Sequence, residues 1–230
     1  MKTLNKIWIY RFISLGILFF LFSCGNDEDT SPSDEAIDAD GNKYETVTIG
    51  NQVWMAENLK TTKLNDGTEI PNVPENTPWS SLETPGLCWY NNNETQNKDV
   101  YGALYNWHTI ASGKLCPAGW HVPSSDEWEV LYDYLGDSAA SKLKETGNTH
   151  WLIENKDATN GTGFTARPGG YRVPNTGFQQ KGYYGYWWSS TSDPNNIDRV
   201  YGREMNAQSR DGSEVVYNRN YGMSVRCLKN

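Results

Sequence analysis

The stretch CPAGWHVPSSDEWEVL, from Cys116 to Leu131, holds a cysteine, a histidine, two tryptophans and three carboxylates, which raises the question of a reactive site. Its spacing points elsewhere. Ser124 stands three residues before Glu127, the S-x-x-E pattern of a capping box at a helix start, and Gly136 is a helix stop signal. The apolar side chains between them repeat along one helix face: Trp128, Leu131, Tyr132 and Leu135. The stretch therefore predicts a helix whose acidic residues stabilise its first turn.

Residues 1–23 have the pattern of a secretory signal peptide, with a basic start and an apolar run from Phe12 to Phe22. This run is too short to span a bilayer as a helix. It ends at Ser23-Cys24, which resembles the processing site of bacterial lipoproteins and implies cleavage before Cys24 and attachment of a lipid to that cysteine. We expect residues 24–37 to form a flexible acidic tether.

This acidic tether also resembles the surface-export signals of Bacteroidetes lipoproteins. We therefore expect an outer-membrane lipoprotein that is exposed at the cell surface and held to the membrane by its lipid at Cys24. The chain carries 28 acidic and 20 basic residues, for a formal net charge of −8. Because phosphate binding needs a basic face, this acidic balance argues against nucleic acid as a partner.

The remaining residues, 38–230, are enough for one domain of ordinary size. Their pattern is an opening hairpin over residues 44–55, then helices, then strands, which indicates an α+β fold. We predict further helices over Val100–Ile110, capped by Asp99, and over Ala139–Glu145, capped by Ser138. The predicted strands are Gly163–Ala166, Tyr171–Val173, Tyr184–Ser190, Val200–Asn206, Glu214–Tyr217 and Met223–Cys227.

Three cysteines follow Cys24, and an exported protein permits disulfides. An odd number allows at most one bridge within the chain. Cys116 with Cys227 would close a loop of about 110 residues and contribute roughly 4–5 kcal/mol. Cys88 with Cys116 is the rival pairing, and a third possibility is that all three are buried thiols.

The sequence carries no metal-binding or catalytic motif. His108, His121 and His150 are scattered, and no second pair of ligands accompanies Cys116 and His121. A nucleophile elbow, an H-E-x-x-H helix and a phosphate-binding glycine loop are all absent from the sequence. We therefore expect no enzymatic activity and no cofactor.

Five motifs, in this order along the chain, closely resemble the Fibrobacter succinogenes major paralogous domain. The likeness extends from about Asp38 to the last residue. The motifs are Trp54–Leu59 (WMAENL), Tyr101–Trp107 (YGALYNW), Cys116–Pro123 (CPAGWHVP), Tyr186–Ser190 (YWWSS) and Ser224–Cys227 (SVRC).

That family is similar to the C-type lectin-like superfold, which also includes the formylglycine-generating sulfatase-modifying enzymes. The resemblance implies a twisted antiparallel sheet with two or three short helices and long irregular loops. The enzymes act through paired cysteines late in the chain, where this sequence has only Cys227, so the fold is expected without the chemistry. C-type lectin-like domains join an early helical region to the last strand by a disulfide, which favours Cys116 with Cys227.

We expect a non-catalytic module that binds a glycan, a fibre or a protein through an aromatic-rich face. Adjacent strand residues point to opposite faces, so at least one of the two neighbouring tryptophans should lie in the core. The candidate ligand-binding residues are Tyr184, Tyr186, Trp187 and Trp188 as stacking platforms, with Arg167, Tyr171 and Arg172 at the rim.

Two alternatives remain open. Asp193-Pro194-Asn195 follows the tryptophan strand, and an acid-Pro-Asn triplet in that loop resembles the sugar-binding calcium site of C-type lectins, whose oxygen ligands suit a hard cation. This would place calcium at Asp193 and Asn195, although the triplet is also an ordinary loop sequence. The other alternative is a purely structural protein of the cell envelope.

Overall fold

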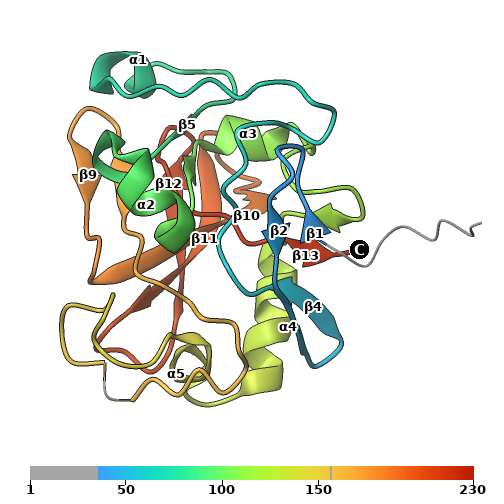
Figure 1. Cartoon of the computed structure of the whole chain (residues 1–230), viewed down its shortest axis with the longest axis vertical. Helices are drawn as coiled ribbons and strands as arrows, with labels where there is room; N and C mark the ends of the chain where they lie inside the picture. The colour runs from blue at the N-terminus through green and yellow to red at the C-terminus, as the bar shows by residue number, and fades with distance from the viewer. Residues whose placement is uncertain (1–35, 156) are drawn as a thin grey trace, which may run out of the picture. The chain divides into compact units, whose positions relative to one another are not determined.

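The computed structural model describes residues 36–155 and 157–230, and the calls on the signal peptide, Cys24 and most of the tether lie outside them. The described residues form one compact α+β unit of small, mostly antiparallel sheets and five short helices, α1 to α5 (Figure 1). None of the helices in these residues is both long and apolar enough to cross a membrane.

A four-stranded sheet brings the two ends of the domain together. The predicted hairpin is present as β3 (Thr46–Ile49) and β4 (Gln52–Met55), which turn at Gly50 and Asn51. β4 pairs with β13 (Leu228–Lys229), which pairs in turn with β7 (Trp120–His121). A two-stranded ladder, β1 (Ala36–Ile37) with β2 (Lys43–Tyr44), precedes the hairpin.

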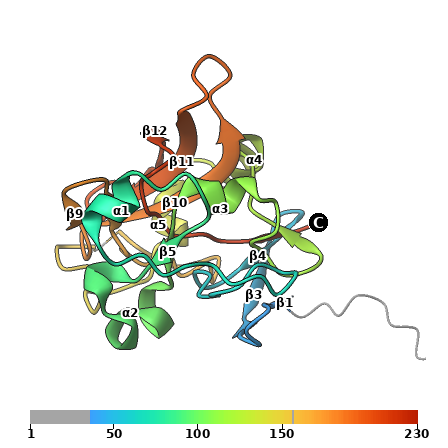
Figure 2. The same cartoon turned by 90° about the horizontal axis from the view of Figure 1, so that it is seen from above.

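A three-stranded antiparallel sheet forms the other main ladder. It consists of β10 (Tyr184–Ser192), β11 (Arg199–Asn206) and β12 (Ser213–Asn218), in that order. The three strands confirm three of the predicted ones, and the loop that joins β10 to β11 projects from the rest of the fold (Figure 2).

Helix α4 (Ser125–Leu135) confirms the prediction for the opening stretch. The Ser124 hydroxyl accepts the Glu127 amide, and the Glu127 carboxylate accepts the Ser124 amide at 2.8 Å. Trp128 is fully buried, and its ring lies 4.7 Å from that of Trp54 on β4, so the apolar face of the helix packs on the hairpin. Each member of the capping box satisfies an amide that the helix leaves free.

The predicted helix Val100–Ile110 is wrong. In its place α2 (Glu94–Tyr101) is capped by Asn93, β6 (Leu104–Tyr105) follows, and α3 (Trp107–Ala111) is capped by Asn106. The helix breaks at Gly102, whose φ is +72° and where a Cβ would lie 2.6 Å from the Leu59 carbonyl oxygen. Only glycine fits so close an approach in that conformation.

Three further predictions need correction. α5 ends at Leu143, and Ser138 has left-handed backbone angles and makes no side-chain cap. Residues 163–166 form only a bridge to Lys144, because the carbonyls of Phe164 and Thr165 accept hydrogen bonds from Arg226 instead of a neighbouring strand. Residues 223–227 likewise pair only through isolated bridges. The other elements are α1 (Asn76–Ser80), β5 (Leu87–Cys88), the 3-10 turn η1 (Tyr90–Asn92), β8 (Tyr171–Val173) and β9 (Gly177–Gln179).

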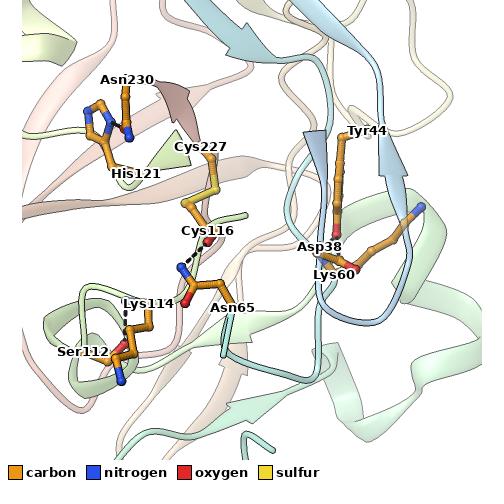
Figure 3. Close-up of a disulfide and its surroundings, with 10 residues drawn as sticks. All are labelled: Asp38, Tyr44, Lys60, Asn65, Ser112, Lys114, Cys116, His121, Cys227 and Asn230. Atoms are coloured by element: carbon orange, nitrogen blue, oxygen red, sulfur yellow. Dashed lines mark hydrogen bonds between the residues drawn. A yellow bond between two sulfur atoms is a disulfide. The ribbon is translucent and has the colours of Figure 1, made fainter. Parts of the chain in front are cut away.

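A disulfide joins Cys116 to Cys227 and confirms the pairing that the family resemblance favoured (Figure 3). It links the segment ahead of β7 to the segment ahead of β13 across 111 residues of chain. The Asn65 side-chain amide donates to the Cys116 carbonyl at 3.1 Å, which ties a third segment to the bridge. Cys88 is a buried free thiol, and burial raises its pKa to about 12.

Candidate functional site

The two tryptophans of the YWWSS motif belong to the core. Trp187 and Trp188 point to opposite faces of β10, as their alternation predicts, but both are completely buried. They lie in two separate apolar clusters, and each indole N–H is used: Trp187 donates to Asn58 Oδ1 at 2.8 Å and Trp188 to the Tyr105 carbonyl at 2.7 Å. Neither ring is therefore available as a stacking platform, which corrects the prediction.

Arg172 is also buried, which corrects its assignment to a ligand-binding rim. Its guanidinium lies between the rings of Trp79 and Phe178, 4.5 and 5.0 Å from their centroids. It donates to the carbonyls of Val73 and Pro74 at 2.6 and 2.8 Å. The side chain holds an irregular loop against β8 and β9, a structural role.

The other predicted aromatic residues come together with two that were not predicted. Five tyrosine rings pack into one cluster, which we call the tyrosine face: Tyr171, Tyr184, Tyr186, Tyr217 and Tyr221. Tyr186 is nearly buried, and the other four are half-buried. The rings of Tyr171 and Tyr221 are parallel within 8° at 5.9 Å, and those of Tyr184 and Tyr186 within 12° at 5.8 Å. Ring surface is thus held in place beside solvent.

Strand alternation and register explain why the rings converge. Tyr184, Tyr186 and Trp188 alternate along β10 and so share one face of the strand. At the Trp188 end this face is buried in the core. Across the sheet, Tyr186 pairs with Glu204, and Val200 pairs with Tyr217. Tyr217 was missed because the sequence does not reveal this register, although the period-two pattern of β12 could have marked it as a face residue. Tyr221 was missed because a bridge between Gly222 and Arg172 brings it beside Tyr171.

All hydroxyls of the cluster with a resolved shift keep their protons at neutral pH. Burial raises the pKa of Tyr186 and that of Tyr171, and it raises the pKa of Tyr217 to about 12. The nearby carboxylate of Glu204 adds to each of these shifts by repelling a tyrosinate. The face therefore offers hydroxyl donors beside a carboxylate, on a surface of aromatic rings.

A polar hollow of about 750 Å³ adjoins this segment of the chain. Its wall includes Asn218, Arg219 and Asn220, the three residues between Tyr217 and Tyr221. The Arg219 guanidinium lies 4.7 Å from the ring of Trp107, and burial lowers the pKa of His108 on the same wall. The hollow thus supplies amide, carboxylate and guanidinium groups from residues that adjoin the tyrosine face in the sequence.

Arg167 is half-buried and lies apart from these residues in its contacts. Its Nε donates to Glu145 at 2.8 Å, and one terminal nitrogen donates to the Val100 carbonyl at 3.2 Å. It borders a different cavity, which contains none of the tyrosines. The predicted combination of Arg167 with the aromatic residues is therefore wrong.

The triplet Asp193-Pro194-Asn195 forms a turn in the structure. One carboxylate oxygen of Asp193 accepts the Asn195 backbone amide at 2.9 Å, and the Asn195 side chain is exposed. Within residues 36–155 and 157–230, no group of three or more histidine, cysteine or acidic side chains is arranged to hold a metal ion. The triplet's geometry is that of ordinary turn chemistry.

Comparison of the sequence with known proteins and protein families identifies the family of the chain. No curated protein and no solved structure matches it significantly. The model of the Fibrobacter succinogenes major domain matches residues 47–229, which include all five motifs and every residue of the tyrosine face. The chain therefore belongs to the Fibrobacter succinogenes major domain family.

Proposed function

We propose that this protein is a non-catalytic, surface-exposed outer-membrane lipoprotein whose tyrosine face binds a glycan. The observation that carries the proposal is the cluster of five tyrosines, four of them half-buried and held by ring-to-ring packing. Tyrosine rings fixed in this way lose little conformational entropy on binding and present both an apolar face and a hydroxyl.

Sugar chemistry suits this surface. A pyranose has an apolar face of C–H groups, which packs on an aromatic ring, and a rim of hydroxyls, which need hydrogen-bond partners. The tyrosine hydroxyls and Glu204 supply partners on the face, and Asn218 and Asn220 supply them at the hollow. These partners make binding specific, because a sugar hydroxyl that is buried without a hydrogen-bond partner costs binding free energy.

The cell-surface location is part of the proposal and rests on the signal-peptide pattern ahead of Cys24. Metabolic labelling with a fatty acid tests the anchor: the wild-type protein should take up label, and Cys24→Ser should not. Protease treatment of intact cells tests exposure, since a surface protein is digested without lysis. Uptake of label by Cys24→Ser would contradict the lipid anchor. Protection of the wild-type protein from protease in intact cells would contradict surface exposure.

The C-type lectin-like fold is likewise proposed. It is supported by the disulfide between Cys116, in the segment that leads into α4, and Cys227, which directly precedes β13, the strand that pairs with β4. An experimental structure that superposes the β3–β4–β13–β7 sheet and α4 on a C-type lectin domain would establish it. Placement of these elements in a different connection order would rule it out.

A glycan array with tyrosine variants tests the binding function. We expect the protein to bind a subset of plant, mucin or host glycans, and Tyr217→Ala or Tyr221→Ala to weaken this binding by about three- to tenfold, the loss of one aromatic contact. Tyr134→Ala is the matched control, because Tyr134 is 65% exposed on α4 and belongs to no ring cluster. Absence of binding to every glycan would leave a protein ligand or a structural role instead.

A further inference from the structure

Arg226, in the SVRC motif, is a buried cation without a carboxylate partner among the described residues. Its side chain is 1% exposed. It donates to Asn58 Oδ1 at 3.0 Å and to the carbonyls of Met55, Phe164 and Thr165, and its guanidinium stacks 4.1 Å from the Phe164 ring. These contacts are all to neutral groups. Buried charges are ordinarily paired in direct contact, whereas the charge of Arg226 is offset only by the more distant Glu57 carboxylate.

A second arginine lies close to the first. Arg167 Nε is paired with Glu145, and one terminal nitrogen is bonded to Val100. The other terminal nitrogen has no hydrogen-bond partner among the described residues. The positive charge of Arg167 also contributes, after burial, to lowering the pKa of Arg226 to about 9. An anion between the two guanidinium groups would relieve this repulsion.

The two arginines border one cavity of about 280 Å³. Its wall also carries two acidic side chains, Glu45 and Glu57, together with Asn58. Glu57 is paired with Lys60 at 3.3 Å, whereas no ion pair involves the exposed Glu45 among the described residues. The cavity thus combines the buried guanidinium of Arg226 and the partly paired guanidinium of Arg167 with the exposed carboxylate of Glu45. Its volume is at the small end of the range for ligand pockets.

The WMAENL motif supplies one wall of this cavity. Ala56, Glu57 and Asn58 border it directly, and Asn58 is fixed on both sides, since its amide donates to the Tyr101 carbonyl at 2.8 Å and its oxygen accepts Trp187 and Arg226. This wall is therefore preorganised, which lowers the entropic cost of ligand binding.

We propose that this cavity binds a small zwitterion of the α-amino-acid class. The ligand carboxylate lies against Arg167 and Arg226, and its ammonium group faces Glu45. This site is separate from the tyrosine face and does not depend on glycan binding, because the two share no residue.

Isothermal titration calorimetry of the purified protein tests the proposal. The probes are the standard amino acids, acetate as a carboxylate without an amine, methylamine as an amine alone, and inorganic phosphate. We expect at least one amino acid to bind with a millimolar or lower dissociation constant, more tightly than acetate or methylamine. The proposal is wrong if no amino acid binds in this range, or if phosphate binds more tightly than all of them.

Variants locate the binding. Arg167→Gln should weaken it by about tenfold or more, the loss of one charged hydrogen bond. Arg210→Gln is the matched control, because Arg210 also pairs with a carboxylate, that of Asp157, and borders no part of the cavity. Equal affinities for the two variants would overturn the assignment.

Glu45→Gln separates the two halves of the ligand. Because Glu45 is exposed, its replacement should leave the fold intact and weaken amino-acid binding a few-fold, without any change for acetate. Equal effects on both probes would overturn the role given to Glu45. Tyr217→Ala should leave amino-acid binding unchanged, which keeps this test distinct from the glycan test.

Discussion

The two ends of the aromatic run on β10 differ in what covers them. Trp187 and Trp188 are buried in the core on opposite faces of the strand, and their indole N–H groups donate hydrogen bonds to residues distant in the sequence. Tyr184 and Tyr186, a few residues earlier, run outward into a cluster that ends at solvent. The same strand thus buries its tryptophans in the core and carries its tyrosines toward solvent, where we propose that a glycan binds, and the aromatic character of the residues alone does not distinguish the two ends.

Truncation at each end of the run is the strongest test of this division. Trp188→Ala should reduce the free energy of unfolding by about 3–5 kcal/mol, because it opens a cavity in the core and removes one of the two donors to the Tyr105 carbonyl, the other being the Met223 amide. Tyr184→Ala should cost only about 1 kcal/mol. Urea unfolding measures both, and similar losses would mean that the tyrosines are as structural as the tryptophans.

Removal of the disulfide tests the support of the core separately from the tyrosine face. The double variant Cys116→Ser, Cys227→Ser should lose about 2–5 kcal/mol of stability, since the reduced chain gains entropy when unfolded. Where the variant stays folded, its glycan affinity should equal that of the wild type, because ring-to-ring packing holds the tyrosine face together. A parallel loss of glycan binding in the folded variant would tie the face to the bridge.

A change of pH produces the smallest expected effect, and a variant of Tyr217 isolates the part of it that comes from the tyrosine face. The pKa of Tyr217 is raised from 10.0 to about 12 in the folded protein, so the unfolded chain loses this proton first. Stability should therefore fall as pH rises from about 10 to 12, and Tyr217→Phe should show a shallower fall. Urea midpoints across this range measure it, with Tyr134→Phe as the exposed control. Identical slopes for all three proteins would contradict the shift.

Local signals predicted α4 well and failed for its neighbour. The cap, the apolar period and the stop of α4 all lie within residues 124–136 and need nothing from elsewhere. The segment 94–111 looked continuous from Val100, yet Gly102 breaks it through a close approach to Leu59. That contact joins residues 43 positions apart, so no reading of the segment alone could find it.

The candidate site was predicted in part for the same reason. Alternation along β10 correctly put Trp187 and Trp188 on opposite faces, but burial of both depends on which segments cover each face. Tyr171, Tyr184 and Tyr186 were anticipated, whereas Tyr217 joins them through the pairing of β10, β11 and β12. Tyr221 joins them through the bridge between Arg172 and Gly222. Arg226 gave no signal in the sequence beyond its motif, because its lack of a counter-ion is a property of the folded core.

The bridge from Cys116 to Cys227 has a consequence for proteolysis. It encloses α4, α5 and all of the β10–β12 sheet, including the projecting loop between β10 and β11 (Figure 2). A protease that cuts once in that loop would leave two fragments joined through sulfur and through the surrounding core. Such a nicked protein would migrate as one species until a reductant separates it, so damage at this projecting loop need not release any part of the domain.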